Sequence, residues 1–162
     1  METDTRNYFA RMTELLARKK ALLAEMLELT RDQTDAINEK SLDKLQKLIE
    51  EKQKRIDEID KLDEDFAACK DRLKAAAGVK ELSELDASRF PGARELKQAT
   101  AEVISIVEEI SGVEKVNSAK SKELLEELGA QVRRMNQAKK LNNAYNRQDV
   151  GGAPSFFLDK KK

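Results

Sequence analysis

The sequence predicts an all-α protein: an antiparallel three-helix bundle with a long third helix and a flexible C-terminal tail. Apolar residues recur at steps of three and four along three long stretches, which is the spacing of one face of a helix. Charged residues make up 38 % of the chain and aromatic residues only 4 %. That charged share lies well above the average of about 25 % and is typical of helices with narrow apolar stripes and wide solvated faces.

The length of 162 residues suits one domain. Short turns between consecutive helices make them antiparallel neighbours. We therefore expect a single bundle over residues 1–145 and a flexible tail over residues 146–162. The expected helices cover about residues 5–38, 41–77 and 92–145, with a weak short helix at about 80–86.

The first expected helix has a wide apolar stripe, which suggests contact with two other helices. Thr3, Asp4 or Thr5 can cap its start, because a short side-chain oxygen accepts from free backbone N–H groups. A basic cluster at residues 18–20 is either a solvated face or a docking patch for an acidic partner. The stripe consists of Phe9, Met12, Leu15, Leu16, Leu22, Leu23, Met26, Leu29 and Ile37.

The second expected helix starts after Ser41, a favourable N-cap, and carries Asp43 in its first turn. Lys52 falls on its apolar stripe, and we expect the stem to lie along the stripe with the ammonium group in water. Cys69 is expected to fill a small space in the core, with a reactive thiol as the alternative. The stripe consists of Leu42, Leu45, Leu48, Ile49, Ile56, Ile59, Leu62, Phe66, Cys69 and Leu73.

The third expected helix is the longest, at about 50 residues or roughly 75 Å. A helix of that length needs partners to be stable in water. Its stripe fades in the middle, at Glu114, Asn117 and Ser121. The first part should complete the core, and the far end is left for another protein. The stripe consists of Leu96, Val103, Val107 and Ile110, then Leu124, Leu128, Met135 and Leu141; for Leu124 and Leu128 we prefer packing within the chain.

Beyond Tyr145 the helical pattern stops, and residues 151–154 read Gly-Gly-Ala-Pro, a sequence that breaks helices. Phe156, Phe157 and Leu158 follow, and such a cluster needs either a docking place on the bundle or a partner. From Arg133 to the end there are eight positive and two negative side chains.

Composition also excludes several functions. Positive and negative side chains balance at 31 each, whereas nucleic-acid binders usually have a basic excess. No segment resembles a signal peptide or a membrane span, so we expect a cytoplasmic protein. With no histidine, one cysteine and no glycine-rich phosphate loop, we expect no enzyme, metal or cofactor. The acidic face between Asp57 and Asp65 lacks the spacing of a calcium loop.

Two stretches give the sequence a family resemblance. Residues 142–145 read Asn-Asn-Ala-Tyr and lead through a glycine-containing link to Phe-Leu-Asp-Lys-Lys at residues 157–161. A turn near Asn38 is followed by a leucine-rich run that ends in Glu-Glu-Lys at residues 50–52. With two long helices, a break and a longer third helix, the chain resembles the FlgN-like flagellar export chaperones over nearly its whole length.

The resemblance implies a cytoplasmic chaperone that binds the terminal helical segments of hook-associated proteins. Such a chaperone prevents premature assembly and delivers its clients to the flagellar type III export apparatus. Tyr145 corresponds to the family's C-terminal aromatic and is the candidate contact for the export gate. The candidate partner-binding residues are Val132, Met135, Leu141, Tyr145, Phe156, Phe157 and Leu158, framed by Arg133, Arg134, Lys139 and Lys140.

The alternative function is a structural or adaptor bundle that self-associates through its third helix. Weak self-association is compatible with the chaperone function as well. A concentration-dependent oligomer without an export client would favour the adaptor.

Overall fold

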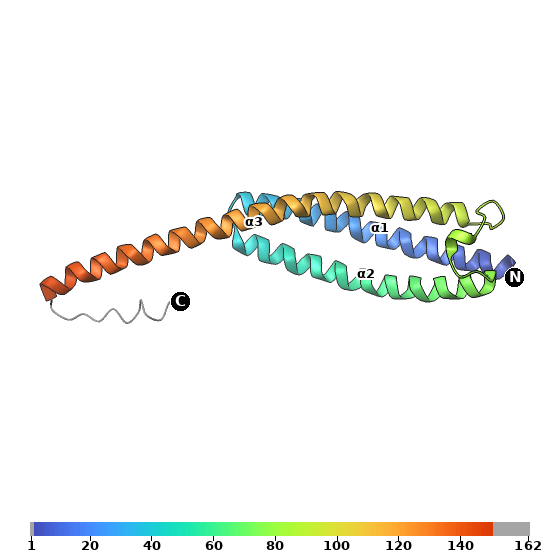
Figure 1. Cartoon of the computed structure of the whole chain (residues 1–162), viewed down its shortest axis with the longest axis horizontal. Coiled ribbons are helices and arrows are strands. Elements are labelled where there is room, and N and C mark those ends of the chain that lie inside the picture. Colours follow the sequence, from blue (N-terminus) through green and yellow to red (C-terminus); the bar gives the residue numbers. More distant parts are fainter. Residues whose placement is uncertain (1, 151–162) are drawn as a thin grey trace. The chain divides into compact units, whose positions relative to one another are not determined.

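The computed structural model describes residues 2–150, and the side chains of residues 4–145, as an all-α fold. Its elements, in chain order, are α1 (Glu2–Asn38), α2 (Leu42–Ala77), a short 3₁₀ helix η1 (Leu82–Glu84) and α3 (Ala93–Val150). Figure 1 shows α1, α2 and the first part of α3 side by side, which confirms the predicted three-helix bundle. We expected α3 to end at Tyr145, but it continues to Val150.

The chain divides into two compact units, Met1–Asn117 and Ser118–Lys162. The first unit contains α1, α2, η1 and the beginning of α3, and it holds the hydrophobic core. The second unit contains the rest of α3. The prediction of one domain over residues 1–145 therefore remains a prediction.

Local sequence explains both ends of α2. The Ser41 side chain accepts a hydrogen bond from the backbone N–H of Lys44, so it caps the helix as its sequence position predicted. At the other end, Gly78 takes a left-handed conformation with φ 70°. Its backbone N–H reaches the carbonyl oxygens of Lys74 and Ala75, which would otherwise lack partners.

All three helices contribute to the core of the first unit. Met12 and Leu73 are completely buried, and Cys69 is 7 % exposed, which confirms its prediction as a core residue. Ala93 joins the core where α3 begins. The core residues are Phe9, Met12, Leu16, Leu23, Met26, Leu27, Ile59, Cys69, Leu73, Ala93, Leu96, Val103 and Ile110.

A layer of buried polar side chains interrupts this core. Asn117 donates from Nδ2 to the carbonyl oxygen of Thr30 at 2.9 Å, and its Oδ1 accepts from Thr34 Oγ1 at 2.5 Å. The Lys52 ammonium donates to Gln33 Oε1 at 2.9 Å and forms an ion pair with Glu114.

Lys52 is only 9 % exposed, so the expectation of an ammonium group in water was wrong. The group is held by two partners from two other helices instead. No buried side-chain nitrogen or oxygen in the described part of the chain lacks a hydrogen-bond partner, as a stable buried polar layer requires.

The segment between α2 and α3 packs against the start of α1. The rings of Phe9 and Phe90 lie 6.1 Å apart, centroid to centroid. Gly92 has φ 92°, and a Cβ atom at this position would lie 2.9 Å from the Cβ of Phe9. This close approach explains why glycine stands directly before α3. Within the segment, η1 is shorter than the predicted helix at 80–86.

Candidate partner-binding surface

Several large apolar side chains in the second unit are exposed to solvent. Leu125 is 68 % exposed, Val132 54 % and Met135 59 %. Leu141 and Tyr145 are 70 % and 76 % exposed. Exposed apolar side chains in a cluster mark an interaction surface more often than single ones do.

Helix geometry places these side chains on two faces. Because α3 is continuous and successive residues turn by about 100°, Leu125, Leu128, Val132 and Met135 follow one line at steps of three, four and three. We call these four residues the Leu125–Met135 strip. The step of six from Met135 to Leu141 turns the helix by about 240°, which places Leu141 on another side.

Leu141 and Tyr145 are four residues apart and therefore lie on the same side of α3. We call this pair the Leu141–Tyr145 face. The candidate residues thus share one helix but form two surfaces, although Met135 and Leu141 were expected on one stripe.

Leu124 and Leu128 are less exposed than the other large apolar residues of this part of α3. Leu124 is 7 % exposed and Leu128 is partly buried, in agreement with the preference for packing at these positions. Leu125 was not among the candidates, although it stands three residues before Leu128 and seven before Val132. That spacing was the signal that could have identified it.

The predicted basic residues Arg133, Arg134, Lys139 and Lys140 are all exposed. By the same helical geometry, Lys139 continues the line of the Leu125–Met135 strip, and Arg134 lies in line with the Leu141–Tyr145 face. Arg133 and Lys140 lie about 100° around the helix from the strip. The positive charges therefore surround the helix and do not frame a single surface.

Three candidate residues, Phe156, Phe157 and Leu158, lie outside the described residues. Their assignment as partner contacts remains a prediction.

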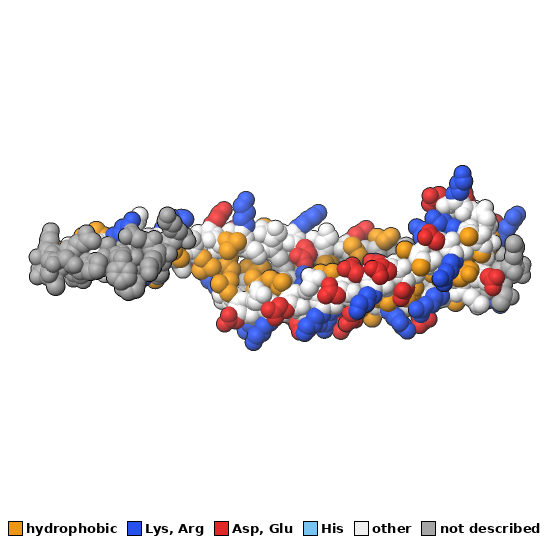
Figure 2. All heavy atoms as spheres, turned by 90° about the horizontal axis from the view of Figure 1, so that it is seen from below, with side chains coloured by type: hydrophobic (Ala, Val, Ile, Leu, Met, Phe, Trp, Pro, Cys, Tyr) orange, Lys and Arg blue, Asp and Glu red, His pale blue; other side chains and the backbone are white. Residues whose placement is uncertain are grey.

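The first unit also exposes apolar side chains. Figure 2 shows hydrophobic side chains gathered between the charged ones on one face of the bundle. Leu42, Ile49 and Val107 were expected on the apolar stripes that face the core, but they are 54 %, 47 % and 45 % exposed. These three positions were misassigned because helical spacing does not report where a neighbouring helix lies.

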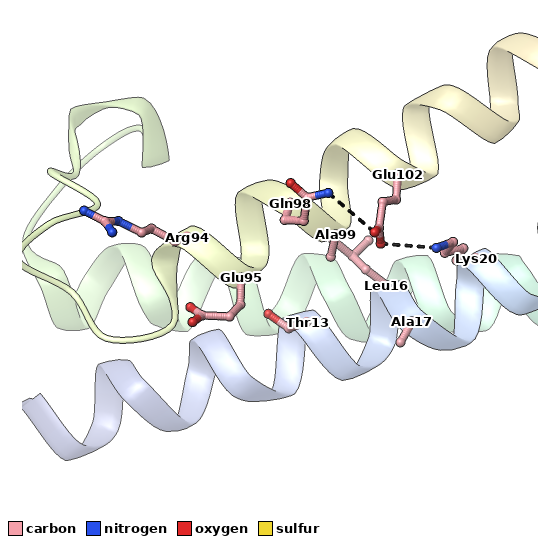
Figure 3. Close-up of a pocket in the computed structure, with 9 residues that line it drawn as sticks. All are labelled: Thr13, Leu16, Ala17, Lys20, Arg94, Glu95, Gln98, Ala99 and Glu102. Carbon is pink, nitrogen blue, oxygen red and sulfur yellow. Dashed lines mark hydrogen bonds and ion pairs between the residues drawn. The ribbon is translucent and has the colours of Figure 1, made fainter.

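A groove of about 570 Å³ runs between α1 and α3 in the first unit (Figure 3). Glu102 lies toward one end of the groove, where it pairs with Lys20 at 3.3 Å and accepts a hydrogen bond from Gln98 at 3.5 Å. Thr13 uses its hydroxyl group to donate to the carbonyl oxygen of Phe9. These groups stabilise the seam between two helices, and they do not converge on a point where a substrate atom could react.

Among residues 2–150, no three histidine, cysteine, aspartate or glutamate side chains are grouped so that they could hold a metal ion. Within the same residues, no helix combines the length and apolar character needed to cross a membrane. Burial raises the pKa of the Cys69 thiol, which is the opposite of what activates a cysteine nucleophile.

The family model described as FlgN protein matches residues 1–149 of the chain. The chain belongs to the FlgN family. No curated protein and no solved structure matches the sequence.

FlgN proteins are flagellar export chaperones, and the family is not an enzymatic one. The match includes both the Leu125–Met135 strip and the Leu141–Tyr145 face. It ends before Phe156, so the three apolar residues of the tail lie beyond the matched part.

Proposed function

We propose that this FlgN-family protein acts in the cytoplasm as an export chaperone for hook-associated proteins. It binds their terminal helical segments, prevents premature assembly and delivers them to the flagellar type III export apparatus. The observation that carries this proposal is the Leu125–Met135 strip, in which Leu125, Val132 and Met135 are each more than half exposed, on a helix of a chaperone family.

The strip suits a helical client for physical reasons. An amphipathic helix buries its apolar face best against another apolar helix face, with contacts repeating every three or four residues. Met135 has an unbranched, adaptable side chain, which suits a surface that accepts more than one client sequence. The positive charges of residues 133–140 attract clients with acidic segments.

Tyr145 is proposed as the contact for the export gate. Because it lies about 80° around α3 from Met135, a client on the strip leaves its ring accessible. Client binding and gate binding then use different faces of one helix.

The test is co-purification of hook-associated proteins with the chaperone and with two variants. Met135→Asp places a charge in the strip and should weaken client binding at least tenfold. Gln137→Asp places the same charge on another side of the same helix and should bind like the unmodified chain. Equal binding by both variants would show that the strip is not the client surface.

A further inference from the structure

The side of α3 that faces α2 carries exposed apolar side chains in the first unit. Glu114 of α3 pairs with Lys52 of α2, so its side of α3 faces α2. Val107 stands seven residues, or about two turns, before Glu114 and therefore lies on the same side. Val107 and Ile104, about one turn earlier, are 45 % and 52 % exposed, so α2 does not cover them. We call these two residues the Ile104–Val107 pair.

A line of three carboxylates runs along α2 at steps of three and four, and it consists of Asp57, Asp60 and Glu64. The line lies about 140–160° around the helix from Leu62, which shares a pocket with Leu22 of α1. It is therefore on the side of α2 that is turned away from α1. We call these three residues the Asp57–Glu64 line.

The apolar pair and the carboxylates lie at the same level of the bundle. α2 and the first part of α3 run side by side in opposite directions (Figure 1). Measured from the Lys52–Glu114 ion pair, Asp60 lies eight residues onward in α2 and Val107 lies seven residues back in α3. At 1.5 Å per residue these are displacements of about 12 Å and about 10 Å in the same direction.

The carboxylates of the line are available for a cation from outside the chain. Asp63, in the same segment of α2, pairs with Lys19 of α1 at 2.7 Å, which shows that a lysine ammonium group fits here. In the described part of the chain, the structure records no ion pair for Asp57, Asp60 or Glu64.

Neighbouring lysines leave this place negatively charged. Lys61 lies beside the line, but Glu108 follows directly after Val107, so carboxylates outnumber lysines at this level. Lys54 pairs with Glu51 at 2.9 Å. Other lysines on the facing sides of α2 and α3 stand six to eight residues farther along, or about 9–12 Å away. They are Lys70, Lys97 and Lys115.

We propose that the Ile104–Val107 pair and the Asp57–Glu64 line together bind a basic amphipathic helix of a partner protein. Apolar side chains of that helix cover Ile104 and Val107, and its lysines or arginines pair with the carboxylates of α2. An amphipathic helix presents these two kinds of side chain beside each other, at the spacing that this face offers. The exposed charges speed association and select the partner, and the small apolar contact makes the complex reversible.

This face differs from the Leu125–Met135 strip in place and in charge. It lies in the first unit and shares no residue with the strip, so the proposal does not depend on client binding. The positive residues of the 133–140 segment attract acidic segments, whereas the Asp57–Glu64 line attracts basic ones. The chain thus offers surfaces of opposite charge to two different partners.

The first experiment uses a fluorescein-labelled synthetic helix with leucines at steps of three and four and lysines at the other positions. A second peptide has glutamate in place of every lysine. Fluorescence anisotropy measures the binding of both peptides to the full chain. We expect the lysine peptide to bind about tenfold more tightly than the glutamate peptide, and to bind more weakly as salt is raised. Equal binding of the two peptides, or no binding of the lysine peptide, overturns the proposal.

The second experiment titrates the lysine peptide against two pairs of variants. Glu64→Lys should weaken binding about fivefold, whereas Glu58→Lys makes the same change of charge about 120° around α2 and should bind like the unmodified chain. Val107→Asp should weaken binding about tenfold, whereas Ser105→Asp, about 160° around α3 from Val107, should have no effect. Circular dichroism checks that each variant is folded. Equal binding by both members of each pair overturns the proposal.

Two further results would assign the peptide or the face to something else. Met135→Asp should bind the lysine peptide like the unmodified chain, and a loss of binding would place the peptide on the Leu125–Met135 strip. Sedimentation of the chain without peptide should give the same mass for the unmodified chain and for Val107→Asp. A dimer that Val107→Asp abolishes would show that a second copy covers this face. Either result overturns the proposal.

Discussion

At the scale of single residues, Lys52 shows how a charged side chain serves the core. The residue occupies an apolar position of α2, yet its ammonium group is stabilised by Gln33 of α1 and Glu114 of α3. Polar layers of this kind specify the alignment of helices, because any shift along the axis separates the partners.

We expect Lys52→Ala to lower the free energy of unfolding by about 1–3 kcal/mol, because it removes the packed stem and leaves the buried Gln33 oxygen without its donor. Lys52→Met keeps an unbranched side chain in place of the stem and should lower the free energy of unfolding by a smaller amount. Urea denaturation measures both variants, with Lys54→Ala as the control, since the Lys54 side chain is 67 % exposed. Equal stability of all three variants would contradict this role.

The sequence did not predict this layer, and the reason is physical. A lysine in an apolar stripe ordinarily places its charge in water by extending its stem. Only the relative alignment of the three helices decides whether a carboxylate lies close enough to pair with the lysine ammonium group inside the bundle. That alignment depends on contacts between residues 62 positions apart, such as Lys52 and Glu114, which helical periodicity does not report.

At the scale of elements, the helices themselves were predictable. Caps such as Ser41 and Gly78 act within a few residues of their own helix, so their effect is visible in the sequence. The exposed positions Leu42 and Ile49 were not predictable, because exposure depends on where a neighbouring helix lies. For the candidate site, Val132, Met135, Leu141 and Tyr145 were named, but Leu125 was missed. The division between two faces follows from the step of six residues between Met135 and Leu141, so the expected continuous helix already contained it.

The connection before α3 gives a prediction at this scale. Gly92→Ala should lower the free energy of unfolding by about 2 kcal/mol or more, because its φ of 92° disfavours a side chain and the new Cβ would collide with Phe9. Gly78→Ala should cost only about 1 kcal/mol, since φ there is 70° and a Cβ would meet no atom within 4 Å.

Thermal unfolding followed by circular dichroism measures both glycine variants. A smaller loss for Gly92→Ala than for Gly78→Ala would show that the contact with Phe9 does not restrict this position.

At the scale of the whole molecule, the hydrophobic core and the proposed binding surfaces belong to different parts of the chain. Every member of the core cluster lies between Phe9 and Ile110. The strip and the Leu141–Tyr145 face lie in the second unit, which begins at Ser118. Substitutions in the strip should therefore alter binding with little change in the stability of the bundle.

Deletion of residues 135–162 tests this separation. The shortened chain should keep a cooperative, helical bundle whose melting temperature differs from that of the full chain by no more than about 3 °C, because no core residue is removed. It should no longer bind a client. Circular dichroism and calorimetry measure the first property, and loss of the folded state on deletion would assign this end to the core.

The contact between Phe9 and the segment before α3 has a consequence for synthesis on the ribosome. Phe9 is translated before Phe90 and Gly92, and it meets them only after α2 and the segment that follows α2 have been translated. The turn at residues 39–41 closes much earlier, since its hydrogen bonds join near neighbours. We therefore expect α1 and α2 of the nascent chain to pair first beside that turn and then progressively away from it. The start of α1 should remain accessible to proteases until α3 has been translated.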